Sequence, residues 1–198
     1  MHVDAVDIGE SLQGPFWHPI SHLHNSNQTA KYATMLTTSP QDRVAKITLD
    51  EATIIARNAD VECEREVALR DLVEENEFRP LRAVAAGHSG PWQLNLSVID
   101  GMLAINIVDA DGKDAGTIGL GMARLRRVIR EYFAICDSYY KALRKATAPE
   151  IETLDMARRA IHDRGTRHLL NIIEGKIVTD FATARRLFTL ICVLHIKA

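Results

Sequence analysis

The sequence predicts an α+β domain, and three observations lead to that fold class. Apolar and polar residues alternate as they do in half-buried strands, and the alternating segments lie near 44–49, 92–98 and 102–108. Apolar residues at alternating spacings of three and four predict one long central helix that ends near Lys145. Helical patterns fill most of the chain after this helix. We therefore expect a small antiparallel sheet packed with a long central helix and C-terminal helices.

Length and composition are those of a soluble globular protein. The chain has 198 residues, of which 46% are hydrophobic and 25% are charged, so folding requires neither disulfides nor a structural metal. Residues 1–43 are polar and show neither the helical nor the strand period, which predicts a flexible leader. Met35 offers a second start, so this leader need not be translated. A single α+β domain then spans residues 44–198.

Turn and capping residues delimit the elements of the first half. Asp60 is the expected N-cap of a helix that should end near Phe78. The glycines and prolines of residues 79–91 predict a loop, in which a polar surface turn is favoured over a pocket for His88 and Ser89. Asp100-Gly101 supplies the turn of an antiparallel hairpin, and Asp111-Gly112 turns the chain again.

The central helix carries the most regular apolar pattern of the chain. The pattern could form a coiled-coil seam, but additional apolar residues widen it, which favours burial in a globular core. The residues of the stripe are Met122, Leu125, Ile129, Tyr132, Cys136, Tyr139 and Leu143. Residues 116–121 before it are rich in glycine, which would suit a phosphate loop, but the spacing fits no nucleotide motif and a simple bend is expected.

Capping signals divide the C-terminal region into helices. Thr147 and Glu150 have the spacing of a capping box, and the helix that they begin should reach Asp163. A break at Gly165 should separate it from a short helix that closes at Gly175. An edge strand is expected at 176–179, and Asp180 should cap a last helix that is apolar nearly all round. That helix is either deeply buried or forms a homodimer contact through Leu187, Phe188, Ile191 and Leu194.

The cysteines and the apolar segments predict a cytosolic protein. Cys63, Cys136 and Cys192 are widely spaced, so neither a disulfide framework nor a cysteine zinc site is indicated. The N-terminus has no secretory signal, and the longest apolar stretch, Leu187 to Ile196, is too short to span a membrane. No membrane partner is expected.

Charge is distributed unevenly although the formal net charge is only −2. Up to Ile118 the chain has 9 basic and 18 acidic residues, whereas from Gly119 onward it has 15 basic and 8 acidic residues. Guanidinium groups pair bidentately with phosphate or carboxylate, so the arginine-rich half contains candidates for an anion site. These candidates are Arg127, Arg158, Arg159, Arg164 and Arg167. The alternative is a solvated helix face, which is the usual role of charge runs on amphipathic helices.

Histidines give only weak catalytic and metal candidates. His162 and His168 lie among the arginines on either side of Gly165, where a neutral imidazole could move protons beside an anion clamp. No second carboxylate or nucleophile stands at a recognisable offset from them. His18, His22 and His24 are close enough to share a transition metal, but they lie in the leader, and we predict neither a metal site nor a cofactor.

Several long strings of residues resemble an uncharacterised bacterial family that has only a placeholder (UPF-type) name. They are residues 63–76, residues 126–140, Asp155-Met156-Ala157-Arg158-Arg159, and residues 180–195, which read DFATARRLFTLICVLH. The resemblance covers about residues 44–198 and excludes the leader. It implies a bacterial cytosolic protein and transfers no activity, cofactor or catalytic residue.

These observations leave three functional hypotheses. The first is a non-enzymatic cytosolic protein that binds or regulates an unknown protein or anionic ligand through its arginine-rich C-terminal half. The second is an enzyme that acts on a small anionic metabolite through arginine and histidine residues, which requires these side chains to converge on one pocket. The third is nucleic-acid binding, although no known nucleic-acid-binding signature is present.

Overall fold

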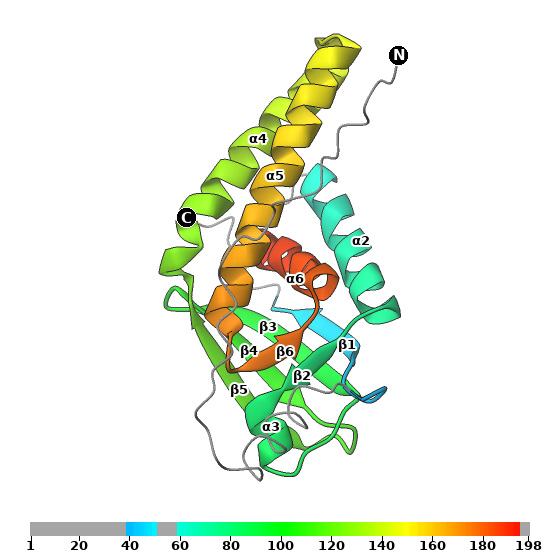
Figure 1. The fold of residues 1–198 in the computed structure, drawn as a ribbon, viewed down its shortest axis with the longest axis vertical. Coiled ribbons are helices and arrows are strands. Elements are labelled where there is room, and N and C mark those ends of the chain that lie inside the picture. The colour runs from blue at the N-terminus through cyan, green and yellow to red at the C-terminus, as the bar shows by residue number, and fades with distance from the viewer. Residues whose placement is uncertain (1–38, 51–58, 195–198) are drawn as a thin grey trace, which may run out of the picture. The chain divides into compact units, whose positions relative to one another are not determined.

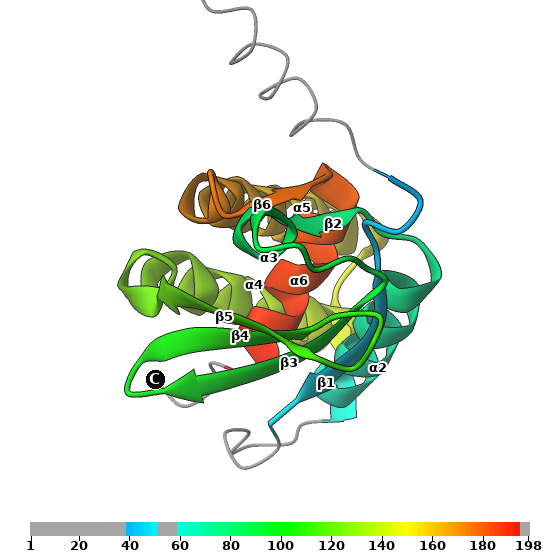
Figure 2. The same cartoon turned by 90° about the horizontal axis from the view of Figure 1, so that it is seen from below.

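A computed structural model describes residues 39–50 and 59–194, and these residues form the predicted α+β fold. The predicted leader, with His18, His22 and His24, lies outside the described residues except for its last few positions. The main sheet is four-stranded in the order β1-β3-β4-β5, and its bounds are β1 Val44–Leu49, β3 Trp92–Ile99, β4 Met102–Val108 and β5 Asp114–Gly121. The helices lie on one face of this sheet (Figures 1 and 2).

The sheet is mixed, which corrects the expectation of a purely antiparallel one. β1 runs parallel to β3, with Leu49 opposite Leu96. A parallel neighbour requires a long crossover, and residues 50–91 supply it, with helix α2 (Ala59–Glu74) in their path. β3 and β4 form the predicted antiparallel hairpin, whose Asp100 and Gly101 have positive φ angles of 52° and 73°. Two consecutive positive φ angles are those of the tight turn that Asp-Gly favours.

The glycine-rich segment before the central helix is a strand and not the predicted bend. β5 pairs antiparallel with β4 over its length, and its residue Leu120 is fully buried. β5 lies at the edge of the sheet, where glycines weaken a strand least because no further strand must pack against them. The segment is therefore extended and paired with β4, and it does not form the compact glycine loop that a phosphate site at a helix start requires.

A second, two-stranded sheet replaces part of the predicted loop at 79–91. β2 (Phe78–Pro80) pairs antiparallel with β6 (Ile177–Thr179), and the short helix α3 (Leu81–Ala85) follows β2. β6 is the predicted edge strand. α2 ends at Glu74 and not near Phe78 as expected. The Asn76 side chain donates to the Leu72 carbonyl at 2.6 Å and takes the place of the next helical hydrogen bond.

The central helix is α4 (Arg126–Lys145), preceded by the 3-10 turn η2 (Met122–Arg124). Leu125, Ile129 and Tyr132 of its apolar stripe are buried, whereas Leu143 at its far end is 50% exposed. The expected capping box forms, since Glu150 accepts from the Thr147 backbone N–H at 2.8 Å. α4 and the following helix α5 lie side by side, and their distal ends extend beyond the sheet (Figure 1).

α5 (Ala148–Ile173) is one continuous helix, so the predicted break at Gly165 is wrong. Gly165 lies against the ring of Phe188 in the last helix α6 (Phe181–Leu194), and a β-carbon at this position would overlap that ring. The glycine therefore permits close packing of two helices and does not end one. The expected cap of α6 is present, with the Thr183 N–H donating to Asp180 at 2.6 Å.

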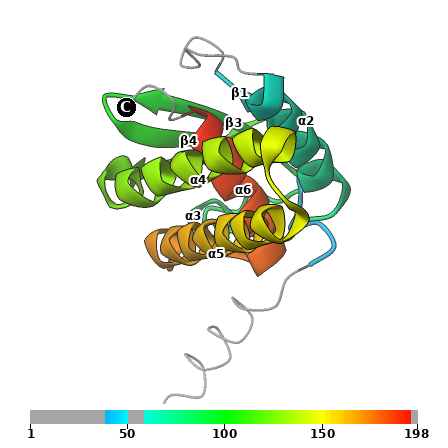
Figure 3. The same cartoon turned by 90° about the horizontal axis from the view of Figure 1, so that it is seen from above.

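α6 forms the centre of the described fold. It lies between the four-stranded sheet and α5 in the views from below and from above (Figures 2 and 3). The four side chains proposed for a homodimer contact, Leu187, Phe188, Ile191 and Leu194, are at most 2% exposed and fill this chain's own core. A contact between copies would therefore require another surface. Within the described residues, no helix combines the length and the apolar character needed to cross a bilayer.

Candidate anion-binding site

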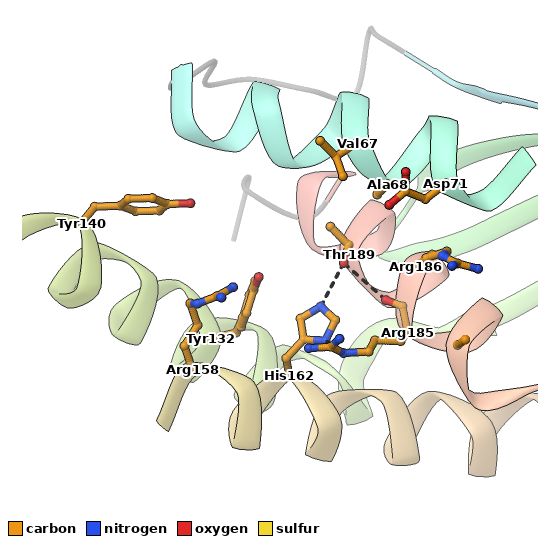
Figure 4. A pocket seen from close by; sticks show the side chains of 11 residues that line it. Val67, Ala68, Asp71, Tyr132, Tyr140, Arg158, His162, Arg185, Arg186 and Thr189 are labelled. Atoms are coloured by element: carbon orange, nitrogen blue, oxygen red, sulfur yellow. Dashed lines mark hydrogen bonds between the residues drawn. The ribbon is translucent and has the colours of Figure 1, made fainter. Parts of the chain in front are cut away.

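A cavity of about 520 Å³ lies between α2, α4, α5 and α6 (Figure 4). α2 and α5 face each other across it, and α6 contributes side chains between them. The residues that line it are Val67, Ala68, Asp71, Tyr132, Tyr140, Arg158, His162, Ala182, Arg185, Arg186 and Thr189. Its wall therefore combines apolar and aromatic surface with three guanidinium groups and a single carboxylate.

Helical spacing explains why these side chains meet. Residues three or four apart share a helix face, so Arg158 and His162 of α5 both point into the cavity. The same rule places Arg185 and Thr189 of α6 on one face. Since the packing of Gly165 on Phe188 brings α5 and α6 together, these two faces become adjoining walls of one site.

The hydrogen bonds of His162 define its tautomer. Arg185 Nε donates to His162 Nδ1 at 3.1 Å, and a guanidinium can act only as a donor, so Nδ1 has no proton. Nε2 therefore carries the proton and donates to Thr189 Oγ1 at 2.9 Å. The Thr189 hydroxyl donates in turn to the Arg185 carbonyl at 3.3 Å. Both ring nitrogens are thus engaged, Nδ1 by Arg185 and Nε2 by Thr189.

Burial keeps this imidazole neutral. His162 is 5% exposed, and its ring packs edge-on against Tyr132 and Phe188 with centroid distances of 5.0 Å and 5.3 Å. Desolvation lowers the pKa of His162 to about 4, and the positive charge of Arg185 acts in the same direction. Asp163 opposes this shift, whereas Arg158 adds to it. At neutral pH the residue is therefore an uncharged acceptor for Arg185.

Each cavity arginine is also held by a group on its own or a neighbouring helix. Arg158 donates to Asp155 at 2.8 Å and lies over the Tyr139 ring. Arg185 Nε is 3.2 Å from Asp163. Arg186 donates to the backbone carbonyl of Glu75 at 2.5 Å. Such partners orient a guanidinium while leaving part of its five N–H donors for another acceptor.

The structure brings together only two of the residues proposed from the sequence. Arg158 and His162 line the cavity. Arg127 and Arg164 instead share the carboxylate of Glu131, which links α4 to α5. The remaining candidates lie on exposed helix surface away from the cavity: Arg159 pairs with Asp155, Arg167 lies over Phe181, and His168 is exposed.

The sequence analysis missed the groups that α2, α4 and α6 contribute. On α6, Thr189 follows Arg185 by four residues and Arg186 by three. This helical spacing could have indicated that the three side chains lie near one another. Asp71 and Tyr132 carry no local signal, because only the packing of α2 and α4 against α6 places them in the cavity.

A histidine–aspartate pair outside the cavity has a structural role. His88 Nδ1 is 2.7 Å from Asp109, whose other oxygen accepts the backbone N–H groups of Asp111 and Lys113 at 3.0 Å and 2.9 Å. These hydrogen bonds lower the pKa of Asp109 and fix the β4–β5 turn to the segment before β3. Across residues 39–50 and 59–194, no group of three His, Cys, Asp or Glu side chains is placed to hold a metal ion.

Comparison with known proteins identifies the family. Residues 41–197 match the model of an uncharacterised protein family, UPF0262. The chain belongs to this family. A UPF0262 protein of Novosphingobium aromaticivorans is 64% identical over 159 residues, which cover 78% of this chain and 97% of the relative. UPF0262 proteins of Erythrobacter litoralis and Brucella anthropi are 62% and 48% identical over 157 residues each, covering 79% of this chain and 98% and 95% of the relatives.

These comparisons confirm the resemblance to an uncharacterised bacterial family with a placeholder name. The names of these UPF0262 relatives state no activity, ligand or partner. No solved structure matches the chain.

Proposed function

We propose that this protein binds a small organic anion in the cavity between α2, α4, α5 and α6, and that it acts through this binding without catalysing a reaction. The observation that carries the proposal is the lining, in which Arg158, Arg185 and Arg186 outnumber the single carboxylate of Asp71. Guanidinium groups remain charged at every physiological pH and match the geometry of carboxylate and phosphate.

The proposed absence of catalysis rests on His162. A general base needs a ring nitrogen that can reach the substrate proton, and both nitrogens of His162 are engaged by Arg185 and Thr189. The residue is better suited to position Arg185 for an anion. A ligand-binding role in the cytosol also suits the buried thiols of Cys136 and Cys192, because a reducing compartment preserves cysteine thiols.

Binding of simple anions tests the proposal. We expect inorganic phosphate or hexanoate, titrated at low ionic strength, to shift the amide resonances of α6 around Arg185 and Thr189. Arg185→Gln combined with Arg186→Gln should weaken binding at least tenfold, because two of the three cationic groups of the lining are removed. A tenfold loss corresponds to about 1.4 kcal/mol.

Arg167→Gln is the matched control. It removes one positive charge, against two in the double variant, from exposed α5 surface outside the cavity lining, and it should leave anion affinity within about twofold. The proposal fails if neither anion binds at millimolar concentration, or if Arg167→Gln weakens binding as much as the double variant does. Circular dichroism of each variant establishes that the fold is retained.

A further inference from the structure

We infer that the ligand carries two anionic groups joined by an apolar segment. The inference rests on the proposed function and specifies the chemical class of the anion. Its basis is the arrangement of charge in the cavity: Arg158 lies toward one end, next to Tyr132, and Arg186 lies at the opposite end (Figure 4). Arg185 and His162 lie between them, on the side toward α5.

The length of α5 gives the scale of the separation between Arg158 and Arg185. Arg185 is held by Asp163, whereas Arg158 is held by Asp155 on the same helix. From Arg158 to Asp163 the helix rises about 7.5 Å at 1.5 Å per residue. One carboxylate is too small to reach cationic groups at both levels, and a chain of several carbons with an acidic group at each end can do so.

The middle of the cavity is suited to an apolar segment. Val67 and Ala68 of α2 line it from one side, and the Tyr132 ring lies across from them. Val67 is 41% exposed, so a large apolar side chain at this site remains uncovered by the protein. Covering apolar surface stabilises a complex by about 25 cal/mol per Å² before the costs of association.

The single carboxylate of the lining, Asp71, is paired with a cation outside the lining, and the Glu75 carboxylate lies 3.9 Å from Arg186 Nη2 at the other end. Asp71 lies 3.1 Å from the guanidinium of Arg70, which is exposed. The carboxylates that hold Arg158 and Arg185, Asp155 and Asp163, are outside the lining. They orient the two guanidinium groups.

A series of straight-chain dicarboxylates from malonate to suberate tests the inference, with hexanoate as the monoanionic reference. Isothermal titration at constant ionic strength should give an affinity that peaks within the longer members of the series and exceeds that of hexanoate at least tenfold. Arg158→Gln should weaken dicarboxylate binding at least tenfold more than hexanoate binding, because a monoanion can still use Arg185 and Arg186 whereas a dianion loses the partner of its second acidic group. Arg167→Gln should change neither affinity.

The outcomes distinguish the proposed anion site from the inference that its ligand has two anionic groups. If hexanoate binds and the dicarboxylates bind no more tightly, the anion site stands and the two-ended ligand is wrong. Equal weakening of hexanoate and dicarboxylates by Arg158→Gln also contradicts the two-ended ligand. If none of these anions binds at millimolar concentration, the proposed function itself fails.

Discussion

At the scale of single residues, the contact between Gly165 and Phe188 determines how closely α5 and α6 approach. Glycine inside a helix costs about 1 kcal/mol relative to alanine, which is why the sequence pattern was interpreted as a break. The cost is offset because Phe188 occupies the space that a β-carbon would take and is itself fully buried. A local propensity is thus overridden by a contact with a residue 23 positions along the chain.

Gly165→Ala should therefore destabilise the protein despite the higher helix propensity of alanine. We expect a loss of about 1–3 kcal/mol in the free energy of unfolding, as for other overpacked cores, measured by urea denaturation. Gly121→Ala is the control, because no atom lies near its β-carbon position and its φ of −69° suits alanine. Phe188→Leu combined with Gly165→Ala should recover part of the loss. An unchanged midpoint for Gly165→Ala would contradict this account of the helix contact.

His162 should make stability depend on pH. Its pKa is about 4 in the folded protein against 6.5 for a free histidine, so the unfolded chain binds its proton more readily. The stabilisation is complete above about pH 6.5 and is lost progressively as the pH falls toward 4. Between pH 7 and pH 5 it should decrease by about 2 kcal/mol.

Urea denaturation at pH 7 and pH 5 measures this effect, with His162→Gln as the comparison. The groups that face His162 are Arg185 and Thr189 of α6, Arg158 and Asp163 of α5, and Tyr132 of α4. All of them remain in the variant, as do His88 and His168, so the difference between the two proteins isolates His162. Equal losses of stability in both proteins would refute the assignment.

At the scale of elements, Asn76 connects the end of α2 to the edge strand β1. Its side-chain oxygen accepts the Val44 N–H at 2.6 Å, and its amide group donates to the carbonyls of Val44 and Leu72 at 3.0 Å and 2.6 Å. One side chain therefore ends a helix and takes the place of a strand partner. No sequence pattern reveals this link, because Val44 and Asn76 are 32 residues apart.

Asn76→Ala should cost about 1–3 kcal/mol, since the partly buried backbone groups that it satisfies lose their partner. Asn95→Ala is the matched control, because Asn95 also contacts β1 but through one exposed hydrogen bond, to Thr48 at 2.9 Å. Its loss should stay within about 0.5 kcal/mol. Thermal denaturation of both variants distinguishes the two, and similar melting temperatures would show that Asn76 has no special role.

At the scale of the whole molecule, α6 packs between the four-stranded sheet and α5, which the sequence predicted only as separate elements (Figures 2 and 3). Nine of its side chains, among them Thr183, Leu190 and Val193, are buried. The ends of α4 and α5 farthest from the sheet have exposed residues such as Leu143 and Met156 and extend away from this core (Figure 1).

Hydrogen exchange should therefore differ sharply between these regions. We expect the amides of α6 to exchange only through global unfolding, because local opening would expose the core. Amides near residues 141–152, at the connected ends of α4 and α5, should exchange at least a hundredfold faster. Mass-spectrometric exchange of the native protein measures both. Similar protection of the two regions would contradict a core centred on α6.

The sequence by itself determined the α+β class, the β3–β4 hairpin, the capping box at Thr147 and the cap at Asp180. These features depend on alternation, helical period and turn chemistry, which act over a few residues. The tertiary structure alone decided the parallel pairing of β1, the strand at Asp114–Gly121 and the continuity of α5. It also selected Arg158 and His162 from the proposed site residues and added Arg185 and Arg186. Each of these outcomes depends on which segments, distant in sequence, pack against one another. Hydrophobic burial determines this packing, and because it is non-directional, a short stretch of sequence does not show which segments will meet.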